Sequence, residues 1–394
     1  MMKRRRTLPC VMILLGVIVV MSGCTGTMPD TGTKAVTTIR GTEGSQEAVG
    51  SAPTMTEAQR AYHNASEFYR VREIGKAIEN YERSIALDPT YVDPFYGLGR
   101  IYLVETQEFD KALDMYRSAV ELAPGDAYSH TSLAYAYFVV GEYQLSVEEY
   151  VEAVQLDPGN ADAYLNLGYA YEKMNMDLAA LNAYRRAQEL KPSDTRASQS
   201  LAQIYYRAKM YDQSIASFER VRRSGAASQY TLSTLGFLYM KLGDYENAET
   251  LFLTVLQKSP DDVASRSNLA TVYRAKGDYD SAAAQYEELI AKRPDDPSYL
   301  AALADAYNDA GRHDSAITTA RRLLQVAPGS GSAYVAWAKA LERKGDFEGA
   351  ISKLESAKSD PEWRAHAVKE IERQNQLIER AQQQKLRELW DSGE

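Results

Sequence analysis

The sequence contains few cysteines and histidines, the residues that most often act as nucleophiles or metal ligands. Only two of its 394 residues are cysteines, Cys10 and Cys24. Because both precede residue 25, the remainder of the chain can form no disulfide, no thiolate metal site and no cysteine nucleophile. The four histidines are equally scattered: His63, His130, His313 and His366. They are too far apart along the chain to share a metal ion, so we expect no metal site and no cofactor.

The common catalytic motifs are also absent. The sequence has no phosphate-binding Gly-x-x-x-x-Gly-Lys-Ser/Thr loop, no Gly-x-Ser-x-Gly elbow and no His-Glu-x-x-His pair. We therefore expect a protein that is not an enzyme. A catalytic role would require a cluster of titratable residues with perturbed pKa values, which a structure would reveal.

The charge balance argues against nucleic-acid binding. Lys and Arg number 45 and Asp and Glu 54, and no basic run follows residue 6. Loss of the four basic residues at positions 3–6 would leave 41 against 54, a net charge of −13. Such a chain repels phosphate groups, so we expect no nucleic-acid partner. With 45% apolar and 25% charged residues, the chain as a whole is typical of folded protein.

The first 23 residues have the layout of a signal peptide. A basic start, Met1 to Arg6, precedes an apolar stretch that ends in small residues. The apolar stretch is shorter than the roughly 20 residues that span a bilayer comfortably, which makes a stable membrane helix the weaker alternative. We therefore predict a signal peptide over 1–23.

The segment Met21-Ser22-Gly23-Cys24 resembles the lipobox of bacterial lipoproteins, although Met21 stands where leucine is usual. The resemblance implies a lipid on Cys24 and membrane attachment in a bacterial cell envelope. Thr25 follows Cys24 in place of the aspartate that favours inner-membrane retention, so the periplasmic face of the outer membrane is expected if the cell has two membranes. The alternative is a plain signal peptide with an incidental cysteine. Residues 24–56 are dominated by Thr, Gly, Ser and Ala and are predicted to be a flexible linker.

The remainder of the chain repeats with a period of 34 residues. Prolines mark the period at Pro89, Pro124, Pro158, Pro192, Pro260, Pro294 and Pro328. Small residues share it: Ala65, Gly99, Ala134, Gly168, Ala202, Gly236, Ala270, Ala304 and Ala338. An aromatic residue follows most of them three positions later, from Phe68 to Tyr307. The one interval of 35 is assigned to an extra residue in the turn at 105–108.

Each unit is predicted to be two helices. Apolar residues recur at three- and four-residue spacing on either side of a polar turn, as at Gly141-Glu142-Tyr143. The small residue allows close approach of the two helices, a nearby ring fills the space left, and proline ends the second helix. A single unit cannot cover its own apolar face, whereas stacked units can.

This pattern resembles the tetratricopeptide repeat, with Leu98-Gly99 and Tyr102, Leu167-Gly168 and Tyr171, and Leu235-Gly236 and Tyr239 as the closest matches. The resemblance implies an all-α, right-handed solenoid of about nine helix-turn-helix repeats over 57–362. The expected boundaries are about 57–91, 92–126, 127–160, 161–194, 195–228, 229–262, 263–296, 297–330 and 331–362.

Residues 363–394 form a long charged segment rich in Gln, Glu and Arg. An apolar stripe containing Val368, Ile371 and Ile378 predicts a helix that caps the last repeat. Leu386, Leu389 and Trp390 near its end leave open an alternative in which the distal part pairs with another chain.

In the tetratricopeptide family the concave face is built mainly from the first helix of each repeat. Carried onto this sequence, that register selects aromatic and basic side chains as a candidate groove: Tyr62, Tyr69, Arg70, Tyr96, Arg100, Tyr128, Tyr135, Phe138, Tyr169, Lys173, Tyr206, Arg207, Tyr230, Phe237 and Lys241. The matching positions of the seventh and eighth repeats are instead small or polar, among them Asp305, Asn308 and Asp309, with the cation Arg274 just beyond the basic series.

Rings and cations in one groove suit a peptide that carries carboxylates. The opposing interpretation is that the tyrosines pack on neighbouring repeats and the cations pair with local acids such as Glu67 and Glu172. We expect a membrane-tethered scaffold that binds protein or peptide partners and assists assembly of an envelope complex. A glycan-binding scaffold for polysaccharide export or cell-wall metabolism is the alternative.

Overall fold

The computed structural model describes residues 55–392, so the predicted signal peptide, Cys24 and nearly all of the predicted linker lie outside the described residues. The described chain is helical throughout, without a strand. It divides into two compact units, which meet in the sequence after Pro192, and each unit is treated separately.

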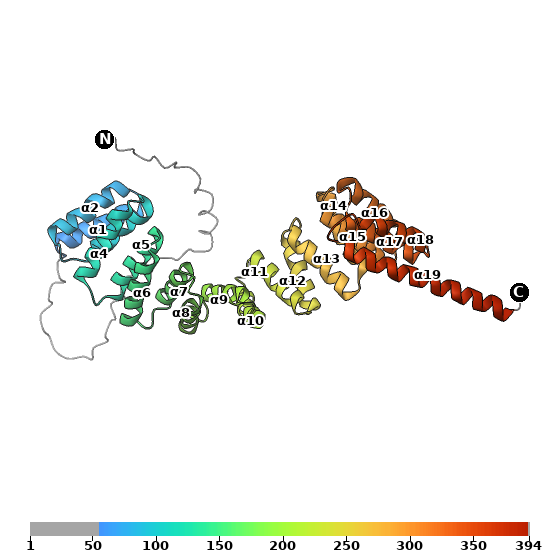
Figure 1. Ribbon diagram of the computed structural model, residues 1–394. Coiled ribbons are helices and arrows are strands. Elements are labelled where there is room, and N and C mark those ends of the chain that lie inside the picture. Colours follow the sequence, from blue (N-terminus) through green and yellow to red (C-terminus); the bar gives the residue numbers. More distant parts are fainter. Residues whose placement is uncertain (1–54, 393–394) are drawn as a thin grey trace, which may run out of the picture. The chain divides into compact units, whose positions relative to one another are not determined.

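Unit 1 contains four helical hairpins, which follow one another in chain order (Figure 1). Its elements are α1 (Glu57–Arg70), α2 (Ile74–Leu87), α3 (Asp93–Arg100), the π-helical segment η1 (Ile101–Glu105), α4 (Phe109–Leu122), α5 (Ala127–Val140), α6 (Tyr143–Leu156), α7 (Ala161–Lys173) and α8 (Asp177–Leu190).

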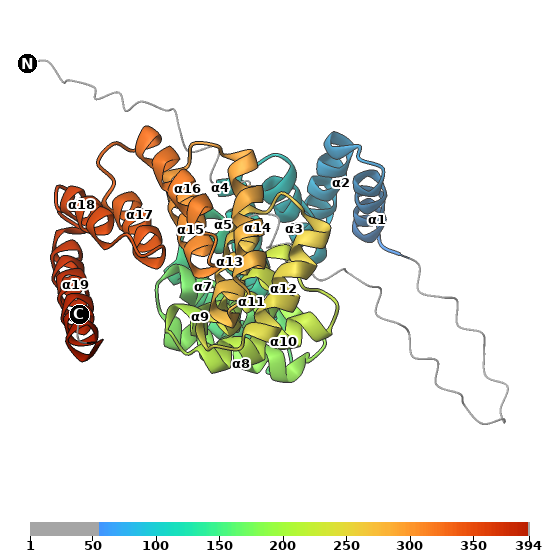
Figure 2. The same ribbon diagram turned by 90° about the vertical axis from the view of Figure 1, so that its right-hand side faces the viewer.

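Unit 2 contains five further hairpins and a terminal helix. Its elements are α9 (Thr195–Arg207), α10 (Tyr211–Arg223), α11 (Gln229–Lys241), α12 (Tyr245–Lys258), α13 (Val263–Lys276), α14 (Tyr279–Lys292), α15 (Pro297–Asp309), α16 (His313–Val326), α17 (Gly331–Arg343), α18 (Phe347–Ala357) and α19 (Arg364–Ser392). The last three helices lie side by side in both views (Figure 2).

In the first seven hairpins a small residue and a ring of the second helix pack together in the core, whereas the eighth and ninth carry Ala320 and Leu354 in place of that ring. A Cβ placed on Gly168 would lie 2.4 Å from the ring of Tyr184, so α7 and α8 can approach this closely only because glycine has no side chain. Equivalent second-helix rings are fully buried: Tyr116, Tyr150, Tyr184, Phe218 and Phe252. Where the second helix carries serine as its small residue, the hydroxyl donates to the facing helix, as from Ser146 Oγ to Ala134 O at 2.8 Å. These contacts bury the apolar face that a lone hairpin would expose.

The seven first helices from α5 to α17 share a capping residue that recurs with the same period. Asp126, Asn160, Asp194, Ser228, Asp262, Asp296 and Ser330 each accept a hydrogen bond from a backbone N–H of the first turn. This satisfies N–H groups that have no partner inside the helix and fixes where each repeat begins.

The extra residue of the second repeat lies in a different place from the one predicted. It is taken up by the π-helical segment Ile101–Glu105, where Thr106 N donates to Ile101 O across five residues at 3.1 Å, and the turn that follows has ordinary length. One added residue is accommodated in a helix by widening a single turn. The assignment to the turn at 105–108 was therefore wrong.

Helix α19 covers the apolar side of the last hairpin with its first part. Ala367 is fully buried beside Leu354 and Ala357 of α18, and Ile371 packs on the same cluster. Arg373 also binds Glu342 of α17. The distal part differs, because Leu386 is 66% exposed and Trp390 is 87% exposed. Capping therefore involves the N-terminal half of α19, and pairing of its distal half with another chain stays a prediction.

Candidate functional site: charged clusters on the first helices

In unit 1 the predicted groove residues lie on four first helices. Tyr62, Tyr69 and Arg70 are on α1, Tyr96 and Arg100 on α3, Tyr128, Tyr135 and Phe138 on α5, and Tyr169 and Lys173 on α7. In unit 2, Tyr206 and Arg207 are on α9, and Tyr230, Phe237 and Lys241 are on α11. The structure brings only part of this set into mutual contact.

Arg100 is the centre of the tightest group. Its guanidinium lies 4.6 Å from the ring centroid of Tyr69, and its charge acts on the hydroxyls of Tyr62, Tyr116 and Tyr128. We call these five residues the Arg100 cluster. It draws side chains from α1, α3, α4 and α5, so it depends on the stacking of three hairpins.

The guanidinium of Arg100 lacks an anionic partner within residues 55–392. Its Nε is buried and has no hydrogen-bond acceptor, and no carboxylate of the described chain forms an ion pair with it. The hydroxyl of Tyr116 is buried without a partner as well. Buried N–H and O–H groups are nearly always satisfied in native proteins, so two unsatisfied groups within one cluster are unusual.

The π-helical segment follows Arg100 directly. It directs Glu105 toward the first hairpin, where Glu105 Oε1 accepts from Tyr69 Oη at 3.0 Å and pairs with Arg72 at 2.7 Å. Glu105 thus holds the ring on which the Arg100 guanidinium rests. Single π-helical turns occur frequently at functional sites.

Tyrosine ionisation does not neutralise this positive charge. Burial raises the pKa of Tyr62, Tyr69 and Tyr128, and the nearby Arg100 opposes the rise only in part. The three phenols are therefore protonated at neutral pH and can donate hydrogen bonds. The Arg100 cluster carries one net positive charge surrounded by neutral rings.

Several of the predicted rings have a structural role. Tyr96 meets Tyr128 edge to face at 4.7 Å between centroids, and its hydroxyl donates to Asp126 at 2.8 Å. Tyr169 packs on Tyr184 at 5.5 Å. Tyr96 therefore packs on the neighbouring repeat, as the opposing interpretation expects, whereas Tyr169 packs on a ring of its own hairpin.

The other predicted cations are more exposed. Arg70 pairs with Glu67 on its own helix at 2.6 Å, with both side chains largely in solvent. In unit 2, Lys241 lies 5.3 Å from the ring centroid of Phe237, and Tyr206 contacts the same ring at 6.5 Å. Tyr230 is 55% exposed. These cations lack the burial that distinguishes Arg100.

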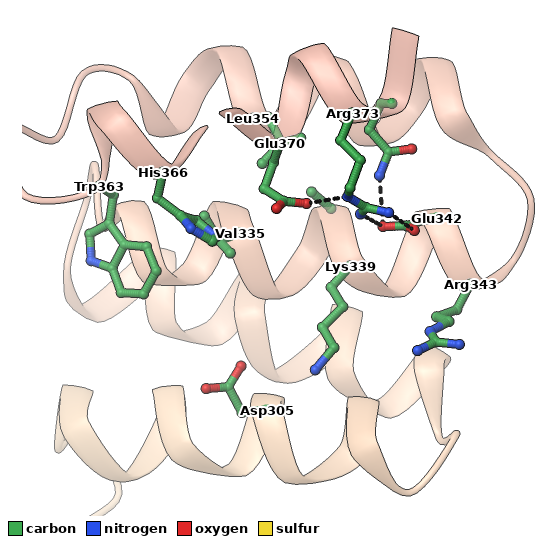
Figure 3. A pocket seen from close by; sticks show the side chains of 12 residues that line it. Asp305, Val335, Lys339, Glu342, Arg343, Leu354, Trp363, His366, Glu370 and Arg373 are labelled. Carbon is green, nitrogen blue, oxygen red and sulfur yellow. Dashed lines mark hydrogen bonds and ion pairs between the residues drawn. The ribbon is translucent and has the colours of Figure 1, made fainter. Parts of the chain in front are cut away.

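A second charged group lies on the first helices of the last hairpins. Asp309 of α15 binds Arg274 of α13 at 2.8 Å and Lys339 of α17 at 2.7 Å. Burial alone would raise the pKa of Asp309, but the hydrogen bonds from Lys339 and Arg274 outweigh it and lower the pKa. Asp305, one turn earlier on α15, borders a cavity of about 450 Å³ between α15, α17 and α19 (Figure 3).

Residues 55–392 contain no group of three or more His, Cys, Asp or Glu side chains that could hold a metal ion. His130, the most buried histidine, is held by Glu149 at 2.7 Å and by the carbonyl of Pro124 at 3.1 Å. In the same part of the chain no helix combines the length and apolarity needed to cross a bilayer.

Stacked helical hairpins with a small residue at each crossing, and a buried ring beside it in most of them, define an α-helical repeat protein. Four family models of the tetratricopeptide repeat match this chain. One matches residues 67–104 and 135–175, a second 92–126 and 161–194, a third 178–229 and 301–363, and a fourth 239–306. The chain is a tetratricopeptide-repeat protein.

Solved structures of other repeat proteins are similar to parts of the chain. MamA is 25% identical over 41% of this chain and 94% of its own, with a TM-score of 0.39. YrrB, described as a TPR protein with an unusual peptide-binding site, is 21% identical over 48% and 97%, with a TM-score of 0.42. PilF of Pseudomonas aeruginosa is 16% identical over 53% and 95%, with a TM-score of 0.46. No curated protein matches the sequence.

Proposed function

We propose that this protein is a non-catalytic adaptor that binds a carboxylate-bearing segment of a partner protein at the Arg100 cluster. The observation that carries the proposal is the buried, unpartnered Nε of Arg100 among protonated tyrosines. A carboxylate would supply the missing acceptor, and the phenols of Tyr62 and Tyr128 would add neutral donors.

The same proposal includes the cellular setting. The lipobox-like segment that ends in Cys24 supports attachment by lipid to a bacterial envelope, at the periplasmic face of the outer membrane in a cell with two membranes. A flexible linker of about 30 residues has a root-mean-square reach of about 30 Å, so partners would be held close to the membrane at raised effective concentration. Assembly of an envelope complex is the role that this arrangement favours.

The binding step is tested with the full chain and two labelled decapeptides. One alternates Glu with Leu, and the other has Gln in place of each Glu. Fluorescence anisotropy should show binding of the Glu peptide that weakens as salt is raised, and weaker binding of the Gln peptide. Arg100→Gln should reduce affinity for the Glu peptide about tenfold to a hundredfold, since a hydrogen bond to a charged group contributes about 1.5–3 kcal/mol.

Arg83→Gln is the matched control, because Arg83 is an exposed arginine of α2 outside the cluster. If Arg83→Gln weakens binding as much as Arg100→Gln, the effect is general charge and the proposed site is wrong. Salt-insensitive binding of neutral oligosaccharides that is lost in Tyr135→Ala and Tyr169→Ala would favour the glycan-binding alternative instead.

The attachment is tested in cells grown with an alkyne-bearing palmitate. We expect the wild-type protein to incorporate the label and to sediment with membranes, and Cys24→Ala to do neither. Cys10→Ala is the control, because Cys10 lies within the predicted signal peptide. Equal labelling of wild type and Cys24→Ala would refute lipid attachment at Cys24.

A further inference from the structure

The cavity between α15, α17 and α19 in unit 2 is lined by an acid on one side and by aromatic side chains on the other. Asp305 lies on one side, Trp363 and His366 lie across from it on the segment that opens α19, and Val335 of α17 lies beside His366 (Figure 3). Its volume of about 450 Å³ is in the range of small-molecule and side-chain pockets.

Most charges that border the cavity are neutralised by neighbours within the fold. Lys339 binds Asp309 at 2.7 Å. Arg373 binds Glu342 at 2.5 Å and Glu370 at 2.8 Å, and Gln374 adds a hydrogen bond to Glu342 at 2.6 Å. These pairs account for every lining charge except Asp305 and the exposed Arg343, which lies at the end of α17 away from Trp363 (Figure 3).

Asp305 itself has no partner within residues 55–392. No hydrogen bond or ion pair joins its half-buried carboxylate to a described side chain or backbone N–H, although Asp309 on the next turn of the same helix holds two cations. Burial raises the pKa of Asp305, and the charges of Arg274 and Lys339 offset this only in part. A desolvated carboxylate without a donor destabilises a fold, so packing alone gives no reason for an acid here.

The aromatic wall of the cavity is fixed in place. Trp363 packs so closely on the start of α17 that a Cβ on Gly331 would lie 2.5 Å from the Trp363 Cβ. Asp360 Oδ2 accepts from Gly331 N at 2.8 Å and ties the same two segments together. The ring of His366 meets the Trp363 ring edge to face at 5.6 Å. A rigid indole near a free carboxylate is the combination that binds organic cations.

We propose that this cavity is a binding site for an alkylammonium group, in the form of a lysine side chain of a partner polypeptide. The ammonium would donate to the Asp305 carboxylate, and the methylene stem would lie along Trp363 and Val335. Charge complementarity selects a cation, because Asp305 is the one lining acid that the fold leaves unpaired. The site is separate from the Arg100 cluster and takes a ligand of opposite charge, so it stands whether or not that cluster binds carboxylates.

The test is ¹⁹F NMR of the full chain labelled with 5-fluorotryptophan, which detects weak binding. The chain has three tryptophans, Trp337, Trp363 and Trp390. Trp337 lies between Arg321 and Lys353, and Trp390 is exposed near the C-terminus, so both serve as internal controls. We expect n-butylammonium chloride to shift the Trp363 resonance saturably, and n-butanol at equal concentration to leave it unmoved.

Asp305→Asn and Asp305→Ala should each weaken n-butylammonium binding at least about tenfold, with thermal unfolding at or above the wild-type temperature. Glu288→Gln, at an exposed acid of α14, should leave binding unchanged. An acetylated, amidated Gly-Gly-Lys-Gly-Gly peptide should compete, and its norleucine counterpart should not. The proposal is overturned if n-butanol binds equally well, if both Asp305 variants bind normally, or if only the Trp390 resonance moves. If n-butylammonium binds but the lysine peptide does not compete with it, the claim that the ligand is a lysine side chain of a polypeptide is wrong.

Discussion

Two acids one turn apart on α15 allow the same substitution to be compared in two environments. Asp309 accepts hydrogen bonds from Arg274 and Lys339, and Asp305 accepts none within the described chain. Replacing either with asparagine removes one negative charge and changes side-chain volume little. Comparing the two variants therefore isolates the contribution of Arg274 and Lys339 to the free energy of unfolding.

The two substitutions are expected to change the free energy of unfolding differently. Each hydrogen bond to a charged group contributes about 1.5–3 kcal/mol. The Asp309 side chain is 19% exposed, whereas Arg274 and Lys339 are 34% and 41% exposed and regain hydration when released. Asparagine also retains one oxygen acceptor, so we expect Asp309→Asn to lower the free energy of unfolding by about 2 kcal/mol. Asp305→Asn should leave it unchanged or raise it, because an unpaired carboxylate returns to water on unfolding.

The assay is urea unfolding followed by tryptophan fluorescence. All three tryptophans belong to unit 2, so the signal reports the unit that contains α15. Arrays of repeats can unfold in parts, which makes a local reporter preferable to a whole-chain signal. Equal destabilisation by the two substitutions would refute the reasoning, since it would mean that Asp305 is held as firmly as Asp309.

Acid titration gives an independent check on the same pair. The pKa of Asp309 is lowered by folding, so its stabilisation is present above the unfolded pKa of about 3.9 and disappears as pH falls through the folded value. The pKa of Asp305 is raised, so its unfavourable effect applies at neutral pH and is relieved as pH falls through its folded value. Any advantage of Asp305→Asn at pH 7 should therefore vanish near pH 4, whereas the cost of Asp309→Asn should persist to that pH.

Two further predictions concern the hairpins and the terminal helix. Gly168→Ala should lower the urea midpoint of unfolding, followed by circular dichroism, at a net cost of about 1–3 kcal/mol. The clash of a Cβ 2.4 Å from the Tyr184 ring should outweigh a helix-propensity gain of about 1 kcal/mol. Gly125→Ala is the control and should not lower the midpoint, because a Cβ there meets nothing within 4 Å. Arg373→Gln should speed hydrogen exchange of α19 amides, and a wild-type rate in that variant would show that Glu342 does not hold the helix. Protection factors of the same amides, which correct for the slower intrinsic exchange at acid pH, should fall in the wild type as pH falls through the folded pKa of Glu342, since Arg373 lowers that pKa and the stabilisation is then lost.

The helical repeat could be predicted from the sequence because it rests on local rules. A small residue every 34 positions, a ring nearby and proline at the end of the unit are enough to indicate the two helices of each repeat. The capping series from Asp126 to Ser330 was equally visible and would have fixed the start of each first helix. The π-helical segment could not be located, because one added residue fits a longer turn as well as a wider helical turn.

The candidate sites were only partly accessible to sequence reasoning. The register placed Arg100 and Asp305 on first helices, but their partners come from other repeats and depend on side-chain direction. Arg274 and Lys339 lie one repeat before and one repeat after α15, and both bind Asp309. No local pattern distinguishes Asp309 from Asp305, since both are acids on one face of one helix. The absence of a partner becomes visible only when three hairpins are placed together.

Arg100 and Asp305 occupy the same position of the repeat, directly after its small residue. The series at this position is Ser66, Arg100, Tyr135, Tyr169, Gln203, Phe237, Thr271, Asp305 and Lys339. The preceding small residue is buried in every repeat, whereas this residue is half-buried or exposed in every repeat. Packing therefore requires the first of the two positions to stay small and leaves the chemistry of the second free. A repeat scaffold can then carry a cation in one hairpin and an acid in another without changing how the hairpins pack. Under the two proposals, the specificity of this protein resides in residues that its periodicity does not constrain.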